Sequence, residues 1–241
     1  MSKQGSVRRG IGLAVLAAAA MAALQPAWAE CDAMPAAQVD WSGCDKYKTT
    51  MGGMDFTGAD LTKAVLARSD LRKSNLTGAK LAEADLNRAV LDNAKLVKAQ
   101  LDKADFGKAR LHGTDLTGAT GTNVDFGRAD LTGADLSAAV LTKADFGRAI
   151  LPHAKLVGTD LTGGDLSRAD ATEADFSKAN LTKVGFSRAI LVKANLTGAN
   201  LDHADLYLTD LTGAVLDGAK ADNARFCRTT MPDGSINDKN C

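Results

Sequence analysis

A repeat of five residues runs through most of this chain. With the frame placed on Phe56 and advanced in steps of five to Phe226, residues 54–228 form 35 consecutive pentads without an insertion. Leu or Phe holds the marked position in 32 of them, and the exceptions are Gly121, Ala171 and Ala221. Ala stands two residues earlier in 26 pentads, and Asp stands between these two positions in 16. A pattern this regular has to be explained by the fold as a whole.

The period of five excludes the ordinary secondary-structure elements. On an α-helix, successive Leu residues five apart would scatter around the axis. On a straight strand, an odd step would send successive Leu residues to opposite faces. The chain must therefore bend once in every pentad, so that one small and one large residue point to a common axis and three residues point outward.

The Phe residues indicate how many pentads make one coil. Phe106, Phe126 and Phe146 stand at the marked position of every fourth pentad, and a column of Arg and Lys residues repeats at the same interval. Four pentads per coil would place these residues directly above one another. At a strand-like spacing of about 4.8 Å, the repeats would give nearly nine coils and a rod of roughly 40 Å.

The repeats resemble the A-(D/N)-L-x-x motif of the pentapeptide repeat family. The resemblance is carried by segments such as ADLTG at 129–133 and ANLTG at 194–198, and it covers residues 54–228. It implies an all-β fold, a right-handed quadrilateral β-helix or solenoid with Leu, Phe and Ala inside. We therefore expect a four-sided solenoid of about nine coils, capped at both ends.

Residues 1–29 are predicted to be a secretory signal peptide. A basic start precedes an apolar run at 10–24, which is shorter than the ~20 residues that span a membrane. The small-x-small sequence at 27–29 then gives a cleavage site after Ala29. The protein is therefore expected to be periplasmic or secreted. Arg8 and Arg9 leave the twin-arginine and the general secretory routes both open.

The segments 30–53 and 229–241 are predicted to be the N- and C-terminal caps, because open ends of a β-rod expose unpaired backbone. Trp41 is expected to cover the first coil. In an oxidising compartment an even number of cysteines suggests disulfides. The simplest pairing is local, since the alternatives would join the two ends of an elongated molecule; the expected pairs are Cys31 with Cys44 and Cys227 with Cys241.

The sequence offers little support for an enzyme. His112, His153 and His203 fall in three different columns of the repeat, and none has a metal-ligand spacing. The triplet Asp145-Phe146-Gly147 matches a kinase signature, but it recurs at 105–107 and 125–127, so the repeat explains it. We predict no catalytic residue, cofactor or metal.

An acidic column lies three residues before the basic column, with small residues between them. The two columns have two interpretations: a mutually neutralising surface ladder, or a flat charged face that docks a partner or an anionic polymer. The candidate binding face comprises Arg88, Asp105, Lys108, Asp125, Arg128, Asp145, Arg148, Asp165, Arg168 and Arg188.

The expected function is that of a non-enzymatic exported protein, a rigid scaffold or protein-binding rod. Its partner would be a protein or an envelope polymer, and rods could also associate end to end. The alternative is a DNA mimic directed at DNA gyrase, as in some members of the family. Without residues 1–29 the chain has 26 basic and 29 acidic residues, a net charge of −3. This near-neutral charge and the export signal disfavour the mimic, and no nucleic acid partner or integral membrane segment is expected.

Overall fold

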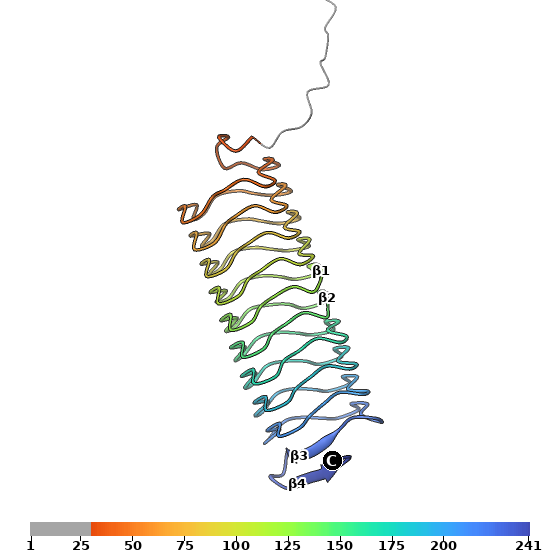
Figure 1. The fold of residues 1–241 in the computed structure, drawn as a ribbon. Coiled ribbons are helices and arrows are strands. Elements are labelled where there is room, and N and C mark those ends of the chain that lie inside the picture. The colour runs from red at the N-terminus through yellow and green to blue at the C-terminus, as the bar shows by residue number, and fades with distance from the viewer. Residues whose placement is uncertain (1–29) are drawn as a thin grey trace, which may run out of the picture.

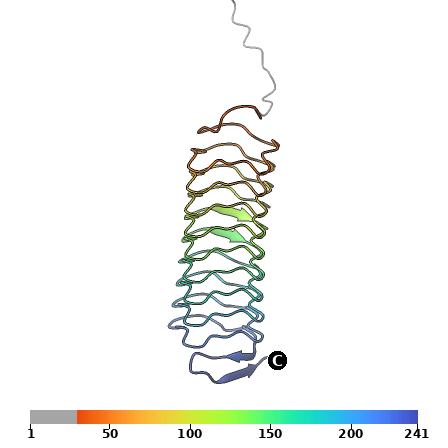
Figure 2. The same ribbon diagram turned by 90° about the vertical axis from the view of Figure 1, so that its left-hand side faces the viewer.

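The computed structural model describes residues 30–241. The predicted signal peptide, residues 1–29, lies outside the described residues. The chain winds into a stack of coils that forms an elongated rod (Figures 1 and 2). Two short parallel strands, β1 (Thr120–Thr122) and β2 (Val140–Thr142), lie on one side of it. An antiparallel hairpin of β3 (Phe226–Thr230) and β4 (Ile236–Lys239) closes the C-terminal end.

Parallel pairing with a fixed offset joins each coil to the next. Isolated bridges link the residue between the two inward positions of a pentad to its counterpart four pentads later, from Asp40 with Asp60 to Asp210 with Thr230. The ladder therefore repeats every fourth pentad, which is the interval that separates the successive Phe residues of the sequence. Residues separated by four pentads form columns along the rod.

Every backbone N–H of a typical pentad finds an acceptor, as residues 130–134 illustrate. Asp130 donates to a carbonyl of the preceding coil at 2.9 Å, and Leu131 donates to a carbonyl of the following coil at 2.7 Å. Gly133 also bonds to the following coil, and Ala134 closes the turn on Leu131, both at 2.9 Å. The remaining N–H, that of Thr132, donates to Asp130 Oδ1 at 3.1 Å. The frequent Asp or Asn of the repeat thus satisfies the one N–H that the ladder leaves over.

Nearly every turn places one residue in the left-handed region, two positions after the inward Leu or Phe. Gly133 has a φ of 65°, but Arg128 at 59° and Ala138 at 56° adopt the same conformation. Side chains are strained in this region, and glycine is not. The repeat accepts this strain many times because the ladder on either side fixes the turn.

Buried aromatic rings line part of the axis. The rings of Phe106 and Phe126 are stacked with centroids 5.0 Å apart, and those of Phe126 and Phe146 are stacked at 4.8 Å. Trp41 is 1% exposed and packs on Phe56, with centroids 5.4 Å apart. Trp41 therefore occupies the interior of the first coil, where it covers Phe56.

A valine fills the space left by one small inward residue. A Cβ added at Gly121 would lie 2.7 Å from a methyl carbon of Val124. Val124 stands where most pentads have Ala, so its extra methyl groups occupy the volume that a Leu at 121 would take. The compensation is local, between two adjacent pentads, and keeps the packing dense.

Both predicted disulfides are confirmed. Cys31 and Cys44 are bonded with Cα atoms 5.4 Å apart, which ties the start of the described chain to the first coil. Cys227 and Cys241 are bonded with Cα atoms 4.7 Å apart, which ties the end of the chain to β3. Among residues 30–241 no helix is long and apolar enough to span a membrane.

The ladder extends beyond the predicted repeat on both sides. It begins at Asp40, inside the segment 30–53, and β3 crosses the boundary drawn between residues 228 and 229. Trp41 and Met51 are buried at inward positions of the same frame. The boundary at residue 54 therefore divides a continuous ladder, because Trp and Met replace the usual Leu there.

Adjacent alanines offer a test of the strained turn. Ala138→Gly should raise the free energy of unfolding by about 1 kcal/mol, because glycine adopts the left-handed conformation without strain. The control Ala139→Gly should lower it by about 1–2 kcal/mol, because Ala139 is 1% exposed and loses a buried methyl group in an ordinary conformation. Urea unfolding of both variants measures the two signs. Loss of stability in both would contradict the assignment of the strain.

Candidate binding groove

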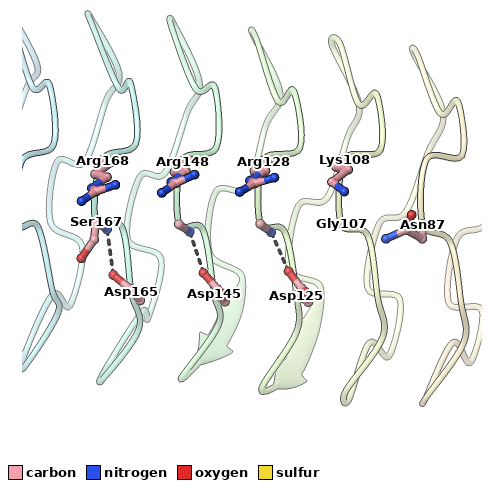
Figure 3. A pocket seen from close by; sticks show the side chains of 12 residues that line it. Asn87, Gly107, Lys108, Asp125, Arg128, Asp145, Arg148, Asp165, Ser167 and Arg168 are labelled. Carbon is pink, nitrogen blue, oxygen red and sulfur yellow. Dashed lines mark hydrogen bonds between the residues drawn. The ribbon is translucent and has the colours of Figure 1, made fainter.

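An open groove of about 620 Å³ runs along one side of the rod. Figure 3 shows a row of basic side chains on one side of this groove and a row of Asp carboxylates on the other. Gly107, Gly127 and Gly147 carry no side chains, and their backbone forms the floor of the groove between the two rows; we call it the glycine floor. The lining residues are Asn87, Gly107, Lys108, Asp125, Gly127, Arg128, Asp145, Gly147, Arg148, Asp165, Ser167 and Arg168.

Seven of the ten residues that the sequence suggests as a binding face line the groove. They belong to two columns of the ladder, and the groove follows these columns over successive coils. The other three, Arg88, Asp105 and Arg188, occupy the same columns but do not line the groove. The repeat pattern does not single out Asn87, which lies in the position that Gly107 takes one coil later.

Each acidic side chain of the groove is held by the backbone. The Oδ1 atoms of Asp125 and Asp145 accept hydrogen bonds of 2.6 Å from the N–H groups of Gly127 and Gly147, which Figure 3 marks as dashed lines. Asp165 accepts the corresponding bond from Ser167 at 2.7 Å. These bonds fix the orientation of each carboxylate. Within residues 30–241, the Oδ2 atoms of these three carboxylates have no hydrogen-bond partner.

The glycines keep the carboxylates uncovered. A Cβ at Gly127 would lie 2.9 Å from Asp125 Oδ1 and 3.9 Å from Asp145 Oδ2. A Cβ at Gly147 would make the same close contact with Asp145 Oδ1, at 2.9 Å. A larger residue at these positions would therefore crowd the acidic row.

The two charged rows do not pair with each other. In the part of the chain that the structure describes, no ion pair involves the four basic side chains of the groove, which are Lys108, Arg128, Arg148 and Arg168. Ion pairs do form elsewhere, for example Arg72 with Asp70 and Arg110 with Asp92, both at 2.5 Å. The neutralising ladder, one of the two interpretations of these columns, is therefore not made of direct contacts, because backbone hydrogen bonds hold the carboxylates on their own side of the groove.

The charged form of Asp125 is destabilised by its surroundings in the acidic row. Burial raises the pKa of Asp125, and the neighbouring charges of Asp105 and Asp145 raise it further against the lowering effect of the Gly127 N–H bond. Asp130, on another side of the coil, differs. Its burial alone would raise the pKa, but hydrogen bonds from His112 and Thr132 outweigh it, and the pKa of Asp130 is lowered.

The histidines lie apart from the groove, and each sits beside a carboxylate on the surface. His112 Nε2 is 2.6 Å from Asp130, His153 Nδ1 is 3.3 Å from Glu173, and His203 Nε2 is 3.8 Å from Asp202. Across residues 30–241, no group of three or more His, Cys, Asp or Glu side chains is placed to hold a metal ion.

Comparison with known proteins identifies the repeat. The family model of pentapeptide repeats matches eight overlapping segments, at residues 48–78, 69–107, 84–120, 99–137, 129–168, 153–188, 165–198 and 189–226. No curated protein matches the chain in sequence.

Several solved structures are similar to this chain. HetL, a pentapeptide repeat protein involved in heterocyst differentiation regulation from the cyanobacterium Nostoc sp., is 30% identical, with 80% of this chain and 93% of HetL covered and a TM-score of 0.43. A pentapeptide repeat protein from the Arabidopsis thaliana thylakoid lumen is 36% identical over 43% of this chain and 69% of its own, with a TM-score of 0.33. Trypsin-treated QnrB1, a plasmid-mediated fluoroquinolone resistance protein, is 20% identical over 79% of this chain and 92% of its own, with a TM-score of 0.40.

The opposite pKa shifts of two aspartates predict opposite effects of the same substitution. Asp125→Asn keeps an oxygen for the Gly127 N–H and removes a repelled charge, so it should raise the free energy of unfolding at pH 7. Asp130→Asn removes a stabilised charge and should lower it. Both changes should be under about 1 kcal/mol, because the groups are partly exposed and screened by solvent.

The pH dependence provides the control for these variants. The destabilising charge of Asp125 is present above its raised pKa and is relieved as the pH falls through that pKa. The stabilising charge of Asp130 is present above the unfolded pKa and is lost as the pH falls through its lowered pKa. Both variants should therefore approach the wild-type stability at low pH in urea titrations. A lower stability of Asp125→Asn at pH 7 would contradict the assignment.

Proposed function

Because this chain belongs to the pentapeptide repeat family, we propose that it is a non-enzymatic rigid rod that binds another macromolecule through the charged groove. The groove carries the proposal, since within residues 30–241 it holds four cations without ion-pair partners opposite three carboxylates with a free oxygen each. Both rows are attached to a backbone that the ladder holds in place. A surface of this kind needs little ordering on binding, which favours recognition.

The overall shape that we propose is a four-sided rod of about nine coils. The pairing of residues four pentads apart supports it, because one bend per pentad gives four bends in each coil. Short coils stacked in this way make contacts only with their neighbours, as in other repeat proteins. The rod would therefore act as a stiff scaffold.

We also propose that the protein works outside the cytoplasm, in the periplasm or after secretion. The two disulfides support this, because such bonds persist in oxidising compartments. The features of residues 1–29 in the sequence are those of a signal peptide. A similar solved structure is that of a protein from the thylakoid lumen, which is also a compartment other than the cytosol.

A gyrase-directed DNA mimic is the less favoured alternative. A DNA mimic needs a strongly acidic surface, whereas the groove has a complete basic row along one side. The similarity to QnrB1, at 20% identity, concerns the fold and carries no function to this chain. The partner that we propose is accordingly a protein or an envelope polymer.

Reversal of the basic row tests the proposed binding role. In pull-downs from the envelope fraction with residues 30–241 as bait, the triple variant R128E, R148E and R168E should lose the partners that the wild type captures. The fold should tolerate the change, because Glu83 and Glu173 already occupy the same turn position with φ of 56° and 57°.

The matched control reverses three lysines at the same turn position in a different column. The variant K103E, K143E and K183E should keep the partners. If every partner survives reversal of the arginines, the groove is only a solvated surface and the proposed function fails.

A further inference from the structure

The charged face that surrounds the groove is complementary to itself. Four successive coils each present one acid and one base, separated by a small residue. The four pairs are Asp105 with Lys108, Asp125 with Arg128, Asp145 with Arg148, and Asp165 with Arg168. We call these pairs the rungs. Because acids fill one column and bases the other, the face has a negative edge and a positive edge. Figure 3 shows both edges at the three rungs from Asp125 to Arg168.

Within residues 30–241, both edges keep charged groups that are free to form ion pairs and hydrogen bonds with a partner. The bases form no ion pair with a carboxylate, and each guanidinium can donate two parallel hydrogen bonds to one carboxylate. The Oδ2 atoms of Asp125, Asp145 and Asp165 are free of hydrogen bonds, whereas Oδ1 is held by the backbone. The glycine floor leaves room above these oxygens. A guanidinium that approached from outside could therefore reach them.

At both ends of the acidic column, the carboxylates are bonded to other side chains of the chain or the acid is missing. At one end, the amide of Asn87 lies 3.5 Å from both oxygens of Asp105. At the other end, Gly185 interrupts the acidic column, and the next acid, Asp205, accepts a hydrogen bond of 2.9 Å from Ser187. Asp105 of the outermost rung and Asp205 beyond the last rung are therefore already engaged by side chains, whereas within residues 30–241 Asp125, Asp145 and Asp165 each keep a free Oδ2.

Symmetry decides how two such faces can meet. If one rod is rotated by half a turn about an axis parallel to its length, the positive edge of each copy faces the negative edge of the other. If the axis instead runs across the rod, within the plane of the face, acids face acids and bases face bases. The parallel arrangement is thus attractive at every rung, and the antiparallel one is repulsive.

The spacing of the rungs favours a second solenoid over other partners. The phenyl rings beneath the rungs repeat at 5.0 and 4.8 Å. An extended peptide presents side chains on one face only every ~6.7 Å, so its charges would drift out of register with the rungs. A second copy has the same spacing by construction, and all four rungs meet their counterparts together.

We infer that two copies of this chain associate side by side through the groove, as a parallel dimer with a two-fold axis along the rods. The Arg row of one copy inserts over the glycine floor of the other and bonds to the free Oδ2 atoms, and the reverse holds across the axis. Each interface residue meets its counterpart twice, as a two-fold interface requires. The inference rests on the proposed binding role of the groove and gives that groove a partner.

A charge-swap experiment tests the inference on purified residues 30–241. In one variant, R128E, R148E and R168E make both edges acidic. In the other, D125K, D145K and D165K make both edges basic. Lysine is compatible with the turn, because Lys80, Lys95 and Lys155 already occupy that position.

Sedimentation velocity at increasing protein concentration reads out the association. The wild type should dimerise more weakly as salt rises. Each variant alone should have a dimer dissociation constant raised by at least ~tenfold, because exposed ion pairs become repulsive. An equimolar mixture of the two variants should restore dimers. The control K103E, K143E and K183E should dimerise like the wild type, and circular dichroism should show that all variants are folded.

The orientation is tested by energy transfer between dyes attached to residue 236 in an Ile236→Cys variant. Parallel rods place these ends together and should give strong transfer within the wild-type dimer. A monomeric wild type, dimers that survive either swap, or a mixture that stays monomeric would overturn the inference. So would weak transfer in the dimer, which would indicate antiparallel rods. A negative result for the dimer would leave the proposed function standing, because binding of the groove to another macromolecule is measured separately in the pull-down.

Discussion

The hydrogen-bonded ladder between coils is the constraint on which the rest of the structure depends. In each pentad, the residue between the two inward positions pairs with its counterpart four pentads later, over almost the whole described chain. This single offset turns positions in the sequence into columns in space. The stacked Phe rings, the acidic row and the basic row are all consequences of it, since each consists of residues that hold the same place in successive coils.

The aspartate of the repeat has two roles that the ladder separates. Its Oδ1 accepts the one N–H of the pentad that is not used between coils, as Thr132 with Asp130 and Gly127 with Asp125 show. Its second oxygen points to the surface. Where Thr follows the inward Leu, its hydroxyl also bonds to the aspartate, as Thr132 does at 2.6 Å. Where Gly follows Phe, no hydroxyl is present, and the floor of the groove is low. The Asp-Phe-Gly triplets thus mark a core stack and, directly above it, an accessible carboxylate.

The sequence alone predicts the interior of this fold well, because one period fixes which residues point inward. The regular interval between the Phe residues also predicts the columns and therefore the groove. The start of the ladder could not be set from the repeat, because Trp41 and Met51 hold inward positions without matching the usual Leu or Phe. The filling of the space at Gly121 by Val124 depends on atomic distances that a pattern does not contain. The separation of the two charged rows also depends on such distances: the sequence leaves open whether they neutralise each other, and backbone hydrogen bonds hold the acidic row on its own side.

Spin labels placed one coil apart test the register most directly. The four cysteines of the described chain are all in disulfides, so added cysteines can be labelled selectively. Val140 pairs with Asp160 in the next coil, whereas Ile150 lies half a coil away although it is nearer in sequence. Nitroxides at 140 and 160 should show strong dipolar broadening, and nitroxides at 140 and 150 should show much less. Stronger broadening in the pair that is nearer in sequence would contradict the coil of four pentads, and with it the columns that build the groove.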